Sequence, residues 1–158
     1  MNLLPFFEWC EHTALGTVIR ESIWMFPVVE AMHLLGLALI GGAVLIVDLR
    51  LFGWGLRRLP VAQIAQDAHP WLVGSTVVML VTGVLLFLSE ATKCYFNAAF
   101  WAKMAFLLAA LVYTFTIRRR VAMADEARIG MTRNRVVAAV SVLLWAGVGI
   151  GGRAIGFY

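Results

Sequence analysis

The chain has 158 residues, of which 62% are hydrophobic and only 14% are charged. One small soluble core cannot hide so many apolar side chains, so the composition excludes a soluble globular domain and indicates a membrane protein. The net charge of +4 does not indicate a nucleic-acid partner, because the basic residues gather in short segments beside hydrophobic stretches.

Residues 1–21 are predicted to form an amphipathic helix that lies along the membrane interface. Glu8 and Glu11 interrupt the apolar stretch, and Arg20 and Glu21 end it, so the segment does not have the pattern of a cleaved signal peptide. Its apolar side chains would enter the headgroup region while the charged face stays in water.

Four apolar blocks follow, each close to the roughly 20 residues that a helix needs to cross a bilayer. We expect transmembrane helices at about residues 23–47, 71–89, 98–117 and 136–152. The predicted fold is therefore an all-α, four-transmembrane-helix bundle, with residues 1–158 forming a single integral membrane domain. Pro60 and Pro70 predict helix ends before the second span, and His69 would mark the start of that span.

The distribution of arginine predicts the topology. Arginines lie between the first and second spans and between the third and fourth: Arg50, Arg57, Arg58, Arg118, Arg119, Arg120, Arg128, Arg133 and Arg135. Loops rich in arginine stay in the cytoplasm, so both termini are expected on the periplasmic side of a bacterial inner membrane. Asp48, beside Arg50, is expected at the inner interface in an ion pair or at a helix end. Glycines that allow close helix packing are compatible with a homo-oligomer.

Cys10 and Cys94 would share the outer, oxidising face under this topology. Two interpretations stay open for them. One is a disulfide that ties the surface helix to the loop "ATKCYFNAAF", which requires Cα atoms within roughly 7 Å. The other is a pair of unpaired, partly buried thiols.

Ionisable residues from all four predicted spans fall in the outer half of the membrane. Helix rise places Glu30 and His33 roughly 10–15 Å below the outer end of the first span. An ionisable group at the bilayer centre costs about 2.5–3.5 kcal/mol on insertion scales, so such groups are expected to face inward and to find partners. The outer polar layer, as we call this set, consists of Glu30, His33, Glu90, Lys103 and Arg153.

Three interpretations of His33 follow from the residues. It could be a haem axial ligand, with Lys103 as the second ligand or as the partner of a propionate. It could instead join a mononuclear copper or zinc site, or it could be hydrogen-bonded between helices, to Glu30 for example. The metal site would take its other ligands from the segment "EWCEH": Glu8, Glu11 and His12. A di-iron centre is not expected, because the Glu-x-x-His pair occurs only once.

Four stretches resemble an uncharacterised bacterial four-helix membrane family, known as a domain of unknown function: "IRESIWMFPVVEAMHLLGLALIGGAVLIVDLRLFG", "TGVLLFLSE", "NAAFWAKMAFLLAAL" and "SVLLWAGVGIGGRAIGFY". The chain is more distantly similar to copper-resistance D-like membrane proteins and to HemJ-type protoporphyrinogen oxidases. In the latter, a first-helix histidine and a third-helix lysine are associated with b-type haem. The segments "EAMH" and "FWAK" place His33 and Lys103 at comparable positions, so the resemblance implies haem b there. The loop pattern "LPRLF" of that enzyme is missing, so porphyrinogen oxidation is not carried over.

Three functions are therefore expected. The first is a b-type haem protein that passes electrons between a quinone and a partner protein, with His33 as ligand and Lys103, Glu30 and Arg153 around the haem edge. The second is a transport component for copper or another small ion, with Glu30, His33 and Glu90 as successive ligands. The third is a membrane anchor or assembly subunit of a larger complex. Serine nucleophile elbows and phosphate-binding loops are absent from the sequence, and enzymatic activity stays open.

Overall fold

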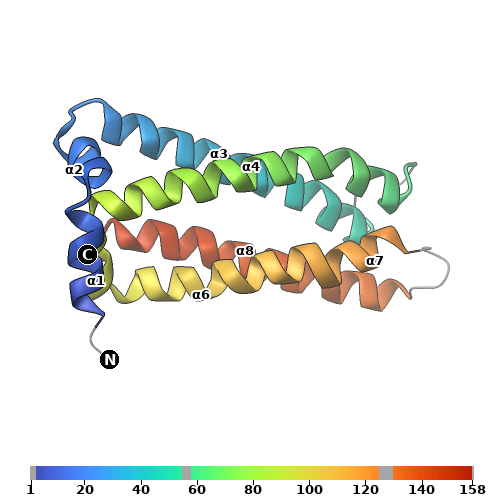
Figure 1. The fold of residues 1–158 in the computed structure, drawn as a ribbon. Helices are drawn as coiled ribbons and strands as arrows, with labels where there is room; N and C mark the ends of the chain where they lie inside the picture. Colours follow the sequence, from blue (N-terminus) through green and yellow to red (C-terminus); the bar gives the residue numbers. More distant parts are fainter. Residues whose placement is uncertain (1–2, 55–57, 125–129, 158) are drawn as a thin grey trace.

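The computed structural model describes residues 3–54, 58–124 and 130–157, and within these ranges the chain is helical and contains no strand (Figure 1). The elements in chain order are α1 (Leu4–Glu11), α2 (Ala14–Glu21), α3 (Met25–Phe52), α4 (Val61–Ser89), α5 (Ala91–Phe96), α6 (Ala98–Tyr113), the π-helical turn η1 (Thr114–Arg118), α7 (Arg119–Met123) and α8 (Met131–Ile155).

Four helices are long and apolar enough to cross a membrane: Met25–Phe52, Val61–Ser89, Ala98–Met123 and Met131–Ile155. This confirms the predicted all-α bundle with four spans. The second span begins at Val61 and not near residue 71, because α4 continues through Pro70. The expected helix end at this proline was wrong, as was the placement of His69 at a helix start. Membrane helices tolerate an internal proline where neighbouring groups satisfy the backbone.

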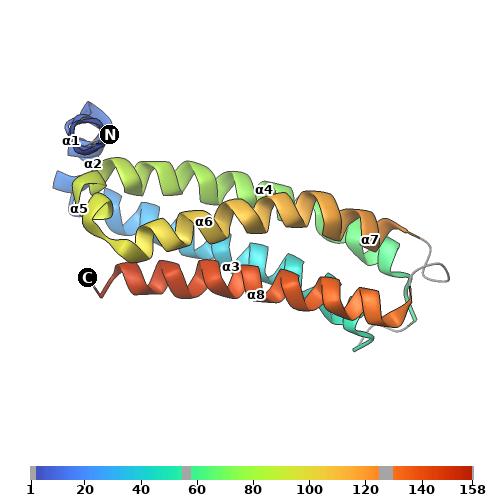
Figure 2. The same ribbon diagram turned by 90° about the horizontal axis from the view of Figure 1, so that it is seen from below.

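The N-terminal segment forms two short helices where one was expected. The first ends at Glu11, with His12 as its C-cap residue. Thr13 caps the start of the second, since its hydroxyl accepts a hydrogen bond from the Gly16 amide at 3.2 Å. Both helices lie across one end of the bundle, beside α5, in the two views of Figures 1 and 2. We call this the capped end, and the opposite end, where α3 joins α4 and α7 precedes α8, the loop end.

Packing within the bundle follows helix pairs. α3 packs against α4 and α8, and α6 packs against α8. Glycine allows α6 and α8 to approach closely, because a Cβ at Gly147 would lie 2.6 Å from the Phe106 ring. One apolar core lies between the four spans and includes Ile40, Val44 and Trp145. Large apolar side chains remain exposed along the spans, as expected for a surface that faces lipid.

The basic residues that predicted the topology gather at the loop end where they are described. Arg57 and Arg128 lie outside the described residues. Both termini lie at the capped end (Figure 1). The bundle is therefore a multi-pass arrangement with its termini on one side.

Candidate functional site

His33 is half-buried on α3 and faces α4, where its Nδ1 lies 3.0 Å from the Thr82 hydroxyl oxygen. That hydroxyl lies 2.7 Å from the Val78 carbonyl, to which it donates its single hydrogen. Thr82 can therefore only accept from His33, which places the imidazole proton on Nδ1. The other ring nitrogen, Nε2, keeps a lone pair that is free to bind a metal or to accept a proton.

Gly83, the residue after Thr82, gives the imidazole its place against α4. A Cβ at this position would lie 3.2 Å from His33 Cε1, which is tighter than an ordinary van der Waals contact. A larger side chain here would therefore displace the ring. Thr82 and Gly83 together fix the orientation of His33. Neither residue was expected from the sequence to orient this ring.

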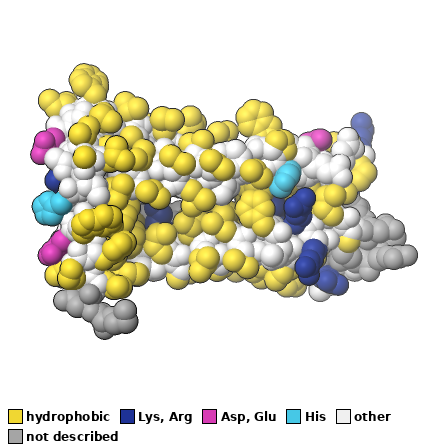
Figure 3. Space-filling view, viewed as in Figure 1, with side chains coloured by type: hydrophobic (Ala, Val, Ile, Leu, Met, Phe, Trp, Pro, Cys, Tyr) yellow, Lys and Arg dark blue, Asp and Glu magenta, His cyan; other side chains and the backbone are white. Residues whose placement is uncertain are grey.

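Lys103 is half-buried on α6 and lies across two glycines of α8. A Cβ at Gly151 would meet Lys103 Cβ at 3.1 Å, and a Cβ at Gly152 would lie 3.7 Å from the ammonium nitrogen. The ammonium group interacts electrostatically with His33 on α3 and with Cys94 on α5. Figure 3 shows a basic side chain recessed in a hollow of the otherwise hydrophobic face, toward the capped end. Of the outer polar layer, His33 and Lys103 are half-buried and lie near enough for the charge of one to affect the other.

The other members of the outer polar layer lie at the surface. Glu30 is exposed, so the hydrogen-bond partner expected for His33 is replaced by Thr82. Arg153 is exposed and its guanidinium lies 4.5 Å from the centre of the Phe157 ring. Glu90 forms an ion pair with Lys93 at 3.6 Å, and both side chains are partly exposed. Long charged side chains at a helix end reach the interface in this way.

The alternative metal ligands do not come together in the structure. Among the described residues, no group of three or more His, Cys, Asp or Glu side chains could hold a metal ion. Glu8 and His12 are exposed on the capped end. Glu11 has protein partners, since it accepts hydrogen bonds from the Thr92 amide at 2.7 Å and from Arg20 at 3.2 Å.

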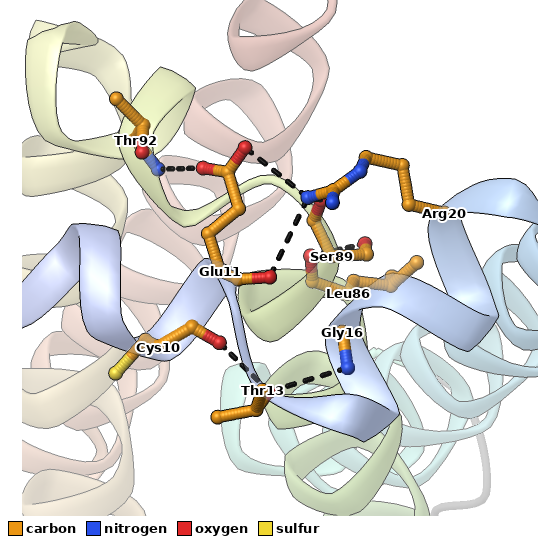
Figure 4. A network of polar contacts seen from close by, with 8 residues as sticks. All are labelled: Cys10, Glu11, Thr13, Gly16, Arg20, Leu86, Ser89 and Thr92. Atoms are coloured by element: carbon orange, nitrogen blue, oxygen red, sulfur yellow. Dashed lines mark hydrogen bonds and ion pairs between the residues drawn. The ribbon is translucent and has the colours of Figure 1, made fainter.

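Glu11 and Arg20 fasten the two N-terminal helices to the bundle (Figure 4). Arg20 also donates to the Ser89 carbonyl at the end of α4. Burial opposes ionisation of Glu11, but the Thr92 hydrogen bonds and the Arg20 charge outweigh it and lower the pKa of the carboxyl below its ordinary value. The carboxylate therefore holds α1 to α5 in its charged form.

Cys10 and Cys94 are free thiols in the structure, so the disulfide considered for them is not formed there. Cys10 is buried in an apolar cluster with Phe7 and Ala91, and burial raises the pKa of its thiol. Burial, followed by the nearby Glu90 carboxylate, raises the pKa of Cys94 to about 11. Both groups are thiols at neutral pH and pack as small apolar side chains.

A second polar centre lies toward the loop end, inside the bundle. Arg118 Nε donates to Asp48 Oδ1 at 2.6 Å, and Arg118 Nη2 donates to the Val44 carbonyl at 2.8 Å. Asp48 is fully buried and Arg118 is 4% exposed. The ion pair expected at Asp48 therefore forms, but with Arg118 and not with the neighbouring Arg50, whose Nε donates to the Leu59 carbonyl.

From its sequence, Arg118 was expected in a cytoplasmic loop with the two arginines that follow it. A signal for its burial was present, because Leu107, Ala110, Thr114 and Arg118 recur at helical spacing and all four are buried. Asp48 continues the buried face of α3 in the same way. Ser141 of α8 lies beside this carboxylate, yet its hydroxyl and Asp48 Oδ2 both lack a hydrogen bond of standard geometry to the described residues.

The fold and these sites define the protein as a multi-pass helical membrane protein with two intramembrane polar centres. A family model matches residues 6–158, so the chain belongs to DUF6644, a family of unknown function. No curated protein and no solved structure matches the chain. The distant similarity to copper-resistance D-like proteins and HemJ-type oxidases therefore stays a prediction from the short motifs.

Proposed function

We propose that this protein binds b-type haem at the capped end of the bundle and transfers electrons in a bacterial inner membrane. The observation that carries the proposal is the hydrogen bond between His33 and Thr82. The Nδ1 proton of His33 is held by Thr82, which leaves an Nε2 lone pair on a half-buried imidazole. Histidines that ligate metals usually donate their second ring N–H in this manner, and the hydrogen bond makes the imidazole a stronger ligand.

Two features of the surrounding residues support the proposal. Gly83 gives the imidazole room beside α4, and Gly151 and Gly152 do the same for Lys103 beside α8. The Lys103 ammonium supplies a positive charge where a haem propionate needs a partner. We assign Lys103 this role and not that of a second axial ligand, because a charged ammonium has no lone pair to give. A bound haem would supply one-electron redox chemistry.

Other residues have roles that follow from the proposed haem site. Thr82 holds the ring tautomer, and Lys103 balances anionic charge. The arginines at the loop end favour a cytoplasmic location for that end, which puts the capped end in the periplasm. There the exposed Glu30 and Arg153 would face a redox partner protein, and a quinone would reach the site from the lipid.

The proposal is tested by visible spectroscopy on detergent-purified protein that was produced with ample haem. We expect a Soret band and a pyridine haemochrome of b type at one haem per chain. His33→Gly should lose both, and added imidazole should restore the band by occupying the vacated ligand position. His69→Ala, at the loop end, is the matched control and should keep the full spectrum. A stoichiometric, unshifted band in His33→Gly would exclude His33 as the ligand.

A further inference from the structure

A cavity of about 140 Å³ lies toward the loop end, between α4 on one side and η1 with α7 on the other. It is separate from the His33 site and does not depend on the proposed haem. Its polar lining comes from Gln66, His69, Thr114, Arg118 and Arg119. Figure 3 shows a histidine beside basic side chains on the part of this face where α4 and α7 lie in Figure 1.

The charge of the lining selects the kind of ligand. Two guanidinium groups and a histidine line the cavity, and no carboxylate is among the lining residues that the structure describes. Arg118 is 4% exposed and already gives one N–H to Asp48 and one to the Val44 carbonyl. An arginine has five N–H donors, so further donors of this buried group remain for a ligand in the cavity it lines. Asp48 balances the charge of Arg118, so Arg119 supplies the net positive charge that favours an anion over a cation. An apolar ligand would leave the donors of Arg118 unsatisfied.

The size of the cavity limits the ligand further. A water molecule takes about 30 Å³ in the liquid, so 140 Å³ corresponds to roughly four or five waters. That is enough for one tetrahedral oxyanion, which has five non-hydrogen atoms, and too little for a nucleotide. Guanidinium groups match the oxygens of such an anion with paired hydrogen bonds.

We propose that this cavity binds a phosphate-type oxyanion, held by Arg118 and Arg119 with Gln66 and His69 as additional donors. Asp48 is the positioning residue, because its ion pair orients the guanidinium of Arg118. Two sources supply this chemistry at the loop end, namely the headgroup of an acidic membrane lipid and free phosphate from the aqueous phase.

The experiment uses the full chain in detergent and three forms of the protein: wild type, Arg119→Gln and Arg120→Gln. Both substitutions remove one positive charge from adjacent exposed residues of α7, but only Arg119 lines the cavity. Native mass spectrometry measures binding of phosphatidylglycerol against phosphatidylcholine. Thermal unfolding at matched ionic strength measures stabilisation by inorganic phosphate against chloride. Arg118 is left unchanged, because its removal would strand the buried Asp48.

We expect Arg119→Gln to weaken the effective probe by about tenfold, the usual loss for one charge-assisted hydrogen bond, while Arg120→Gln stays near wild type. If phosphatidylglycerol is the probe affected, the ligand is a lipid headgroup; if inorganic phosphate is affected, the ligand is the free anion. Equal effects of the two substitutions, or no preference for either anionic probe in the wild type, would overturn the proposal.

Discussion

Arg118 Nε donates to Asp48 Oδ1 across 2.6 Å, and this ion pair joins α3 to the π-helical turn that follows α6. Both side chains are buried, so the pair forms away from water, and the attraction between the charges must offset the loss of their hydration. A second contact, from Arg118 Nη2 to the Val44 carbonyl, fixes the guanidinium in place. The pair therefore acts as a unit in which each charge depends on the other.

Removing one partner of this pair should destabilise the fold severely. Arg118→Met leaves the Asp48 carboxylate buried without a counter-charge, for which we expect a loss of about 3–5 kcal/mol. The measurement is thermal unfolding in detergent, followed by size-exclusion chromatography of the heated protein. The exposed Arg120→Met is the matched control and should change the stability little.

The double variant Asp48→Leu, Arg118→Met separates the ion pair from simple packing. It removes both charges at once, so most of the lost stability should return. A double variant as unstable as Arg118→Met alone would show that the fold needs this pair for a reason other than charge compensation.

The helices were predictable from sequence because twenty-residue apolar blocks have few alternatives in a bilayer. The ends of the helices were less predictable from the sequence. Pro70 is read as a helix end from local chemistry, but α4 continues through it, as membrane helices do where other groups satisfy the freed backbone. The π-helical turn at Thr114–Arg118 has no local sequence signal either, and it ends at the arginine that pairs with Asp48 of another helix.

The docking of α2 on α4 depends on the missing side chain of Gly16. A Cβ there would clash with the backbone carbonyl of Leu88, which cannot move without shifting α4. We expect Gly16→Ala to destabilise the protein by about 1–3 kcal/mol, the usual range for overpacking. Gly74→Ala is the control, because a Cβ at Gly74 meets nothing within 4 Å. Equal unfolding temperatures for the two variants would contradict the observed packing of α2.

The attachment of the N-terminal helices should weaken in acid. The pKa of Glu11 is lower in the folded protein than its ordinary value, so the ionised carboxylate stabilises the folded state at neutral pH. That contribution is present above the pKa of the unfolded chain and disappears as the pH falls through the folded value. The expected size is about 1 kcal/mol, as for a partly exposed charged contact.

The measurement for Glu11 is the unfolding temperature of wild type and Glu11→Gln between pH 7 and pH 3. The two proteins should differ at pH 7 and converge at the acidic end. Glu8→Gln, on the exposed side of α1, should follow the wild type throughout. A constant difference between wild type and Glu11→Gln over this range would rule out the ionised carboxylate as the cause.

Both cysteines should be present as protected thiols. Cys10 is buried, and the pKa of Cys94 is raised to about 11, so little reactive thiolate forms at pH 7.5. We expect iodoacetamide to modify neither residue in the native protein and both residues after denaturation without reductant. Mass spectrometry counts the modified thiols. A denatured protein that reacts only after reduction would instead support the Cys10–Cys94 disulfide.

The candidate site was predictable only in part. His33 and Lys103 stood out because an ionisable group deep in a span needs a partner. Glu30 had the same signal but is exposed, since a residue three positions away on a helix is rotated by about 60° and faces a different neighbour. Thr82 and Gly83 carry no charge, and their roles emerge only when α3 and α4 pack together.

Thr82→Val tests how the imidazole is held. Valine keeps the shape of threonine but cannot accept a hydrogen bond from the Nδ1–H group. His33 should therefore become a weaker and less oriented ligand. We expect the haem to remain bound, with a changed reduction potential and an affinity about 10–100-fold lower. Redox titration and haem transfer to an acceptor protein measure the two effects. Wild-type values for both would contradict the assigned tautomer.

The most direct test of the haem proposal is the reduced-minus-oxidised absorption spectrum of the purified wild-type protein. We expect a b-type spectrum with one haem per chain, which His33→Gly loses and imidazole restores. A colourless protein from cells supplied with haem would contradict it, and the hydrogen bond between His33 and Thr82 would then be a polar contact between α3 and α4 that serves no haem.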